Sequence, residues 1–249
     1  MSVTSANPNG PPSESWYVKT LPSIIPPVAG GMAIIPVYWG IERKSALQNI
    51  KPVPSFTVTQ ALVAGSKAAP IISGIIGAQM GAQIVTENTL TRCFNKGEKP
   101  GIGVTVLSSV TVGAISSPFL TIFNGKSMGM NWIESLRAMS IYQVAMIVSR
   151  ETSFLISIRI SDPLNDKLKE SLGESRKVKY TSAFISGVLG SLFGHMADTG
   201  LTCAQNKVPV TTFRHLWRGS GTRSLTLGTF NVLYSVLNDA LVILGRSLG

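Results

Sequence analysis

The sequence predicts an all-α membrane protein with six transmembrane helices arranged as three repeated helix-pair units. Charged residues make up only 14% of the 249 residues, against about 25% in a typical soluble domain, and the mean hydropathy is +0.28. Six apolar segments of roughly 20 residues are each long enough to cross a hydrocarbon core of about 30 Å. Their breaks recur at nearly equal intervals, which is typical of internal repeats. A buried soluble helical bundle is the alternative fold.

The N-terminal stretch up to Trp16 is rich in Pro, Ser, Asn and Gly. It has neither the apolar core of a secretory signal nor the Arg-rich amphipathic pattern of a transit peptide. We therefore expect residues 1–20 to form a flexible tail.

The first apolar segment, Leu21 to Trp39, contains prolines and glycines, which membrane helices tolerate because neighbouring helices satisfy the freed backbone groups. The second segment runs from Val58 to Val85. We expect a polar link from Thr86 to Pro100 before the third segment, Gly101 to Phe123.

The fourth segment runs from Ser140 to Ile160 and is interrupted by the charged pair Arg150-Glu151. The most polar part of the chain follows, Ser161 to Lys179, which we expect to be a solvated loop. The fifth and sixth segments lie between Phe184 and Leu244. Gly190 and Gly194 in the fifth segment predict close helix packing.

The repeat is visible in two sets of positions. The odd segments break at Pro36, Pro118 and Met196, which are 82 and 78 positions apart. The even segments end at acidic residues spaced by 75 and 77 positions, namely Glu87, Asp162 and Asp239. Three similar units are therefore expected, at residues 21–97, 98–175 and 176–249.

The third unit carries the most specific motif. It contains His195-Met196-Ala197-Asp198, then Gln205, and a turn at Leu216-Trp217-Arg218-Gly219. This resembles one repeat of the mitochondrial carrier family (solute carrier family 25 type). A family repeat has an odd helix ending H-P-x-D-x-x-K-T-R-x-Q, a short matrix helix, an L-Y/W-R-G turn and an even helix ending Y-E-x-x-K. The chain is therefore interpreted as a degenerate member with eroded motifs.

The resemblance implies a ring of ion pairs, in which the acid of one odd helix pairs with the Lys of the next repeat and closes one side. Such pairs can form in one state and break in another, giving a gate. Aligned on the prolines, the sequence keeps Pro36, Pro118, Asp198 and Gln205, but the Lys positions read Ile41, Phe123 and Leu201. No acid–Lys pair is expected under this alignment.

The even helices are eroded in the same way. Their acids Glu87, Asp162 and Asp239 are present, whereas the Lys positions read Leu90, Asn165 and Val242. Three acids without partners repel one another, so this side is expected to close weakly. Asp198 and Asp239 could alternatively be structural, hydrogen-bonded near helix ends.

Ionisable residues inside membrane segments usually face a cavity. Each even segment carries a basic residue, so substrate contact is predicted, if the protein transports, for Lys67, Arg150, Glu151 and Arg223. The alternative is that each basic side chain is bound to a local carbonyl or acid. By the same resemblance, the turn at Trp217, Arg218 and Gly219 would bind cardiolipin.

Several function classes are disfavoured. The net charge is +10, but no basic run or aromatic-interleaved patch indicates nucleic acid, and dispersed Lys and Arg facing anionic lipid account for the charge. Cys93 and Cys203 have no metal-ligand spacing. We expect no enzyme activity, no metal and no cofactor.

The favoured function is a multi-pass mitochondrial inner-membrane protein that no longer transports. It would be a structural or accessory subunit of a larger complex, such as a respiratory assembly. The alternatives are a working transporter that exchanges a small anionic metabolite, and an outer-membrane protein serving in insertion or fusion. Convergence of Lys67, Arg150 and Arg223 on a cavity favours transport. A cavity filled by Phe119, Leu120, Phe123 and Leu201 favours the accessory function.

Overall fold

The computed structural model describes residues 16–94, 101–127 and 131–247, and every regular element within them is a helix. In chain order these are α1 (Trp16–Ile34), the 3-10 turn η1 (Ile35–Val37), α2 (Tyr38–Gln48), α3 (Val58–Phe94), α4 (Ile102–Ser127), α5 (Trp132–Arg137), α6 (Ile141–Leu172), α7 (Arg176–Gln205), α8 (Phe213–Leu216) and α9 (Ser220–Ser247).

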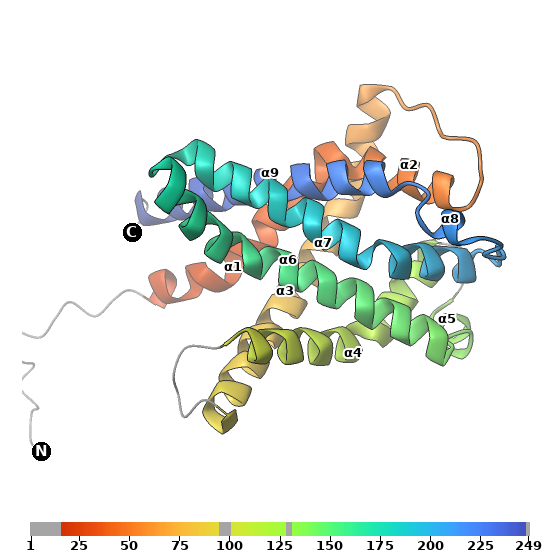
Figure 1. The fold of residues 1–249 in the computed structure, drawn as a ribbon, viewed down its shortest axis with the longest axis horizontal. Coiled ribbons are helices and arrows are strands. Elements are labelled where there is room, and N and C mark those ends of the chain that lie inside the picture. The colour runs from red at the N-terminus through yellow and green to blue at the C-terminus, as the bar shows by residue number, and fades with distance from the viewer. Residues whose placement is uncertain (1–15, 95–100, 128–130, 248–249) are drawn as a thin grey trace, which may run out of the picture.

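The long helices form a closed ring in chain order. α1 packs on α3, α3 on α4, α4 on α6, α6 on α7 and α7 on α9, and α9 packs back on α1 (Figure 1). The short helices α5 and α8 lie at one end of the bundle (Figure 1). The beginning of α1 and the end of α9 lie at the opposite end.

The breaks expected in the odd segments are only partly present. Pro36 lies in η1, between α1 and α2, where its missing N–H interrupts the helical hydrogen bonding. Pro118 lies inside the continuous helix α4, and α7 runs through Met196 without interruption. The sequence therefore repeats more regularly than the backbone does.

Helix boundaries differ from the prediction at the start of α1 and at the end of α3. α1 begins at Trp16, so residues 16–20 are helical and do not belong to a tail; residues 1–15 lie outside the described part. α3 continues to Phe94, so most of the expected polar link is helix. Its remaining residues, 95–100, also lie outside the described part.

The expected loop from Ser161 to Lys179 is wrong, because α6 continues to Leu172 and α7 begins at Arg176. The polar stretch is rich in Lys, Glu and Leu, which are good helix formers, so it extends the helices beyond their apolar parts. The link between them is short: Gly173, with φ +79°, follows α6, and the Ser175 side chain accepts a hydrogen bond from the Val178 N–H at the start of α7.

Close packing in the ring depends on glycines. A Cβ placed on Gly187 would lie 2.5 Å from the Leu227 carbonyl oxygen of α9, and one on Gly190 would clash with Ser157 of α6. A Cβ on Gly194 would lie 3.0 Å from the Cβ of Ser153. These contacts confirm the packing function predicted for Gly190 and Gly194.

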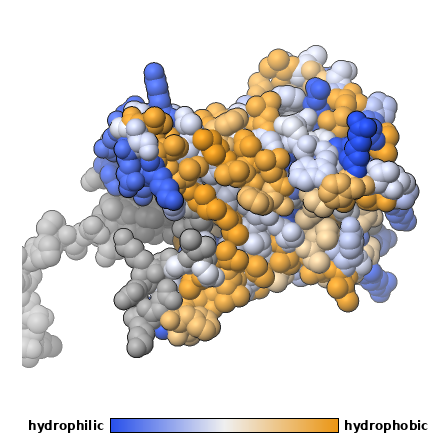
Figure 2. Space-filling view, in the orientation of Figure 1, coloured by the Kyte–Doolittle hydropathy of each residue, from blue (hydrophilic) through white to orange (hydrophobic). Residues whose placement is uncertain are grey.

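Four described helical segments are long and apolar enough to cross a membrane: Ile24–Gln48, Val58–Phe94, Gly103–Ile122 and Phe213–Ser247. On the face drawn in Figure 2, apolar surface lies over the middle of the bundle, and the most hydrophilic surface lies toward its two ends. The all-helical architecture and the apolar segments together indicate a membrane protein.

Candidate functional site

Asp198 lies on α7 with its side chain buried inside the ring. Its Oδ2 accepts hydrogen bonds from the Lys44 Nζ at 2.6 Å and from the Gln48 Nε2 at 2.9 Å. Lys44 and Gln48 are four residues apart on α2, so both project from the same face of that helix and can reach one carboxylate. Alignment on the prolines predicts no acid–Lys pair, whereas the structure pairs Asp198 with Lys44, a residue that this alignment does not place at a Lys position.

Two arginines complete the surroundings of this carboxylate. Arg150 Nη1 of α6 lies 3.8 Å from Asp198 Oδ1, and Arg223 Nε of α9 lies 3.8 Å from Oδ2. A Cβ on Gly194 would lie 3.2 Å from Arg223 Nη2, so the missing side chain leaves room for the guanidinium beside α7. Three cations from three helices thus surround one acid.

A second carboxylate lies next to the first. Glu151 Oε1 accepts a hydrogen bond from Arg150 Nε at 2.7 Å, and its Oε2 accepts one from Gln79 Nε2 of α3 at 2.8 Å. We call Lys44, Arg150, Glu151, Asp198 and Arg223 the charged cluster. It contains three positive and two negative side chains, so its net charge is +1.

The arginines keep most of their hydrogen-bonding capacity. A guanidinium carries five N–H donors. Within the described residues, Arg150 donates one hydrogen bond, to Glu151, and Arg223 donates one, to the Ser191 carbonyl at 2.8 Å. At 3.8 Å, Asp198 is beyond hydrogen-bond distance of both guanidinium groups. The charged cluster can therefore bind a further acceptor group.

The charged cluster lines a cavity of about 710 Å³ inside the ring. Exposed or half-exposed residues of the α2–α3 link and of the end of α7 line its mouth: Lys51, Pro52, Pro54, Gln205 and Asn206. Apolar side chains line the remainder, including Ile72, Ile75, Ile76, Phe154 and Phe230. The centroids of the Phe154 and Phe230 rings lie 6.2 Å apart.

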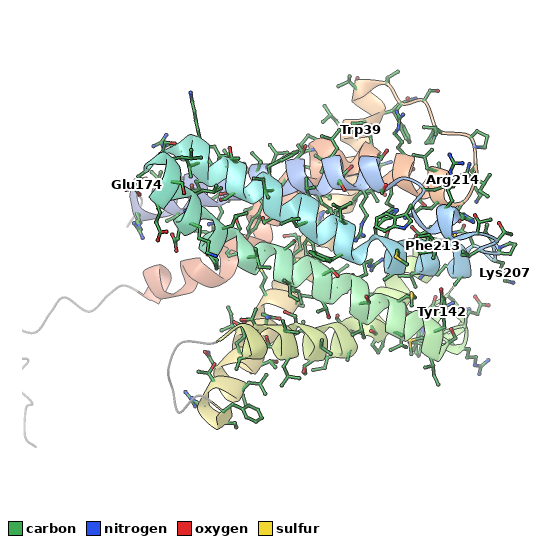
Figure 3. The ribbon with its side chains drawn as sticks, viewed as in Figure 1. Trp39, Tyr142, Glu174, Lys207, Phe213 and Arg214 are labelled. Atoms are coloured by element: carbon green, nitrogen blue, oxygen red, sulfur yellow. The ribbon has the colours of Figure 1, made fainter. Side chains whose placement is uncertain are left out.

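The cavity opens toward one end of the bundle. Its mouth lies at the end where Lys207, at the C-terminal end of α7, and Phe213 and Arg214 of α8 are found, whereas Glu174 lies at the other end (Figure 3). At that other end, Lys179 Nζ contacts both carboxylate oxygens of Asp239, at 2.7 and 2.6 Å. This ion pair joins the beginning of α7 to α9.

The prediction that the acids ending the even segments lack partners is wrong at two of three positions. Asp239 pairs with Lys179. Glu87 is buried, and its Oε1 accepts a hydrogen bond from Gln83 Nε2 at 2.8 Å. Asp162 is exposed on α6. Lys179 is not predicted as a partner, because it falls in the loop expected from Ser161 to Lys179.

The predicted substrate contacts separate into two groups. Arg150, Glu151 and Arg223 converge in the charged cluster, whereas Lys67 is exposed on α3 and does not line the cavity. Four apolar residues are expected to fill the cavity if the protein does not transport. Leu120 lines the cavity, and Leu201 is buried and packs in the same apolar cluster as Leu120. Phe119 is 69% exposed. The Phe123 side chain lies outside the described part.

The remaining predicted positions lie at the cavity, at a second groove and at the turn before α9. Gln205 lines the mouth of the cavity, and Pro36 lines a groove between η1, α2 and α9. Trp217, Arg218 and Gly219 form the turn between α8 and α9, as the sequence predicts. The Trp217 ring packs 5.9 Å from the His195 ring.

Lys44 and Gln48 are the residues of the charged surroundings of Asp198 that are not predicted from the sequence. The sequence feature that could identify them is their spacing of four residues, which equals the spacing of the Lys and Gln in the carrier motif. Aligning on Pro36 placed the Lys position three residues too early, at Ile41. The chain matches no protein-family model and no curated protein.

Proposed function

We propose that the protein is an integral membrane transporter of a small organic anion, with six transmembrane helices in three pairs. The observation that carries the proposal is the charged cluster, which combines a net charge of +1, two incompletely bonded guanidinium groups and a cavity open at one end. Ionisable groups inside a membrane bundle are costly and usually mark a transported solute's pathway.

The arrangement of helices supports a carrier-like fold. The ring closes in chain order, and in the second and third units a short helix, α5 or α8, lies between two long ones. α6 and α7 are the helices that carry Arg150, Glu151 and Asp198. Buried charge lowers the mean hydropathy of a helix without preventing it from crossing the membrane.

The pairing of Lys44 with Asp198 supports the same resemblance. The acid lies in the third unit and the Lys in the first, which is the next unit around a ring of three. Gln48 bonds the same carboxylate and occupies the Gln position relative to Lys44. The chain would thus retain one of the three ion pairs that the carrier pattern implies, displaced by three residues from the proline.

In the proposed mechanism, the free N–H groups of Arg150 and Arg223 bind the anion from the open end. Lys44 and Gln48 hold α2 against α7, and Lys179 holds α7 against α9 at the other end. Transport requires these two ties to break alternately, and the anion promotes the change by binding one state more tightly than the other.

The proposal includes the mitochondrial inner membrane as location and cardiolipin as a lipid partner. The support is the carrier resemblance and the turn at Trp217–Gly219, which directly precedes the N-terminal end of α9 and carries the exposed Arg218.

An accessory, non-transporting subunit is the second candidate. The observation in its favour is the outer face of α3, where a Cβ on Gly74 or Gly81 would meet nothing within 4 Å. Val85 and Phe94 on the same helix are 66% and 68% exposed. Small residues on an exposed membrane helix permit close approach by a helix of another protein.

Uptake into cardiolipin-containing liposomes tests the proposal. Purified protein is reconstituted with internal pools of mono-, di- and tricarboxylates, nucleotides and amino acids, and exchange of labelled anions is followed. We expect exchange that is lost in Arg150→Ala and retained in Lys67→Ala, because Lys67 lies outside the cavity. Absence of exchange by folded, lipid-bound protein would leave the accessory function as the better account.

A further inference from the structure

We propose that the cavity selects an amphipathic anion with a single negative charge, such as a monocarboxylate with a hydrocarbon chain, over anions of higher charge. This inference rests on the proposed function only for the transport step; binding can be measured separately. It names the class of solute that the charged cluster and its apolar wall accept.

The first argument is the balance of charge. The charged cluster has a net charge of +1, and the two other charged residues that line the cavity, Glu42 and Lys51, cancel each other. One bound monoanion therefore neutralises the cavity. A dianion would leave an uncompensated negative charge in the interior of the bundle, which is strongly unfavourable.

The second argument is the geometry of the donors. Lys44 and Gln48 both bond Asp198 at short distance, so these groups already have an acceptor. Arg150 and Arg223 approach the two oxygens of the same carboxylate at 3.8 Å. Both guanidinium groups therefore lie within reach of one further carboxylate, which arginine binds well through paired N–H donors.

The third argument is the composition of the remaining wall. The lining away from the charged cluster and the mouth is largely apolar, with Ile72, Ile75, Ile76, Phe154 and Phe230. Lys51 at the mouth is the one other basic residue among the described lining residues. A second carboxylate placed against the apolar wall would lose its hydration without gaining a partner.

Two six-carbon acids provide the test. Hexanoate and adipate share a hydrocarbon core but carry one and two negative charges at pH 7. Binding to the full-length protein in cardiolipin nanodiscs is measured by isothermal titration calorimetry, with empty nanodiscs subtracted. We expect hexanoate to bind about tenfold more tightly than adipate, or better. Acetate, which lacks a chain, should bind more weakly than hexanoate.

A change of the cluster's charge tests the cause. Glu151→Gln raises the net charge of the cluster to +2, and we expect the preference to move toward adipate. Lys67→Gln removes one positive charge outside the cavity and should leave both affinities unchanged. Arg150→Gln should abolish saturable hexanoate binding. If Glu151→Gln does not fold, the ratio of hexanoate to adipate affinity in the unmodified protein still tests the proposal.

The inference is overturned if adipate binds as tightly as hexanoate, if neither acid binds saturably, or if hexanoate binding persists in Arg150→Gln. Its failure can be distinguished from failure of the proposed function. Arg150-dependent exchange of a dicarboxylate in liposomes would uphold transport and reject this selectivity. Selective hexanoate binding without any exchange would uphold the site and reject transport.

Discussion

The Nζ of Lys44 on α2 lies 2.6 Å from the Oδ2 of Asp198 on α7. α2 packs on α9 and α3 and also contacts α7 directly, although α7 has α6 and α9 as its neighbours among the long helices of the ring. The ion pair therefore holds α2 and α7 together beside the cavity that both helices line. The same carboxylate also faces Arg150 and Arg223. A change in the Lys44–Asp198 ion pair therefore affects the two arginines proposed to bind the anion.

Removal of the Asp198 charge should lower the free energy of unfolding more than removal of the Lys44 charge does. Asp198→Asn leaves three cations with one carboxylate in the charged cluster, whereas Lys44→Met leaves two cations with two carboxylates. Because uncompensated buried charge is expensive, we expect Asp198→Asn to lower the free energy of unfolding by about 3–5 kcal/mol. Lys44→Met should cost about 1.5–3 kcal/mol, the usual contribution of a hydrogen bond to a charged group. Unfolding in mild detergent, followed by circular dichroism, measures both.

Asp239→Asn is the matched control at the other end of the bundle. Its ion pair with Lys179 is partly exposed, with side-chain exposures of 36% and 39%. Exposed pairs contribute about 0–1 kcal/mol, so this variant should unfold almost as the unmodified protein does. If Asp198→Asn and Asp239→Asn lowered the free energy of unfolding equally, uncompensated buried charge could not be the cause of the Asp198→Asn effect.

Helix positions could be predicted from the sequence better than the site could. The apolar segments and the turn at Trp217–Gly219 are visible as local patterns, and the structure contains both. The ends of α3, α6 and α7 were missed because Lys, Glu and Asn in these stretches indicate solvent exposure, and solvated helix is as polar as loop. Arg150 and Arg223 are visible in the sequence as charges within expected apolar segments. Lys44 is not predicted because alignment on Pro36 places the Lys position at Ile41. The spacing of Lys44 and Gln48 is a local pattern, but their partner Asp198, 154 positions from Lys44, is not encoded locally.

Gly187 should be essential to the packing of α7 on α9. In Gly187→Ala the new Cβ would approach the Leu227 carbonyl oxygen to 2.5 Å and the Gly228 Cα to 2.9 Å, so backbone atoms must move. We expect a loss of about 1–3 kcal/mol, the usual cost of overpacking. Gly81→Ala on α3 is the control, because its Cβ would meet nothing within 4 Å. Its thermal unfolding midpoint should be unchanged or higher.

Gly219 should be required for the start of α9. Its φ of +79° lies in the left-handed region, which costs a residue with a Cβ about 1–2 kcal/mol. Its carbonyl accepts the hydrogen bond from the Arg223 N–H at 2.9 Å, so strain there would also displace an arginine of the charged cluster. Gly219→Ala should therefore lower both the unfolding midpoint and anion affinity. Gly221→Ala, whose Cβ would meet nothing within 4 Å, should change neither.

The proposed architecture has six transmembrane helices, whereas four described segments are apolar enough to be candidates by composition. Whether α7 crosses the membrane distinguishes the two. α7 has 30 residues and is about 45 Å long, but its mean hydropathy is low because its polar residues face the ring. Ser182, Ser191, His195 and Asp198 are buried, whereas Phe193 is 78% exposed. The outward face is therefore apolar, as a lipid-exposed helix requires.

Cysteines at the two ends of α7 measure this crossing. Glu174→Cys and Lys207→Cys are made separately in a Cys93→Ser background, since Cys93 is exposed and Cys203 is buried. Glu174 and Lys207 lie at opposite ends of the bundle (Figure 3). In sealed vesicles of uniform orientation, a membrane-impermeant maleimide should label one variant at once and the other only after permeabilisation. Labelling of both from the same side would mean that α7 does not cross, and the three-pair architecture would then be wrong.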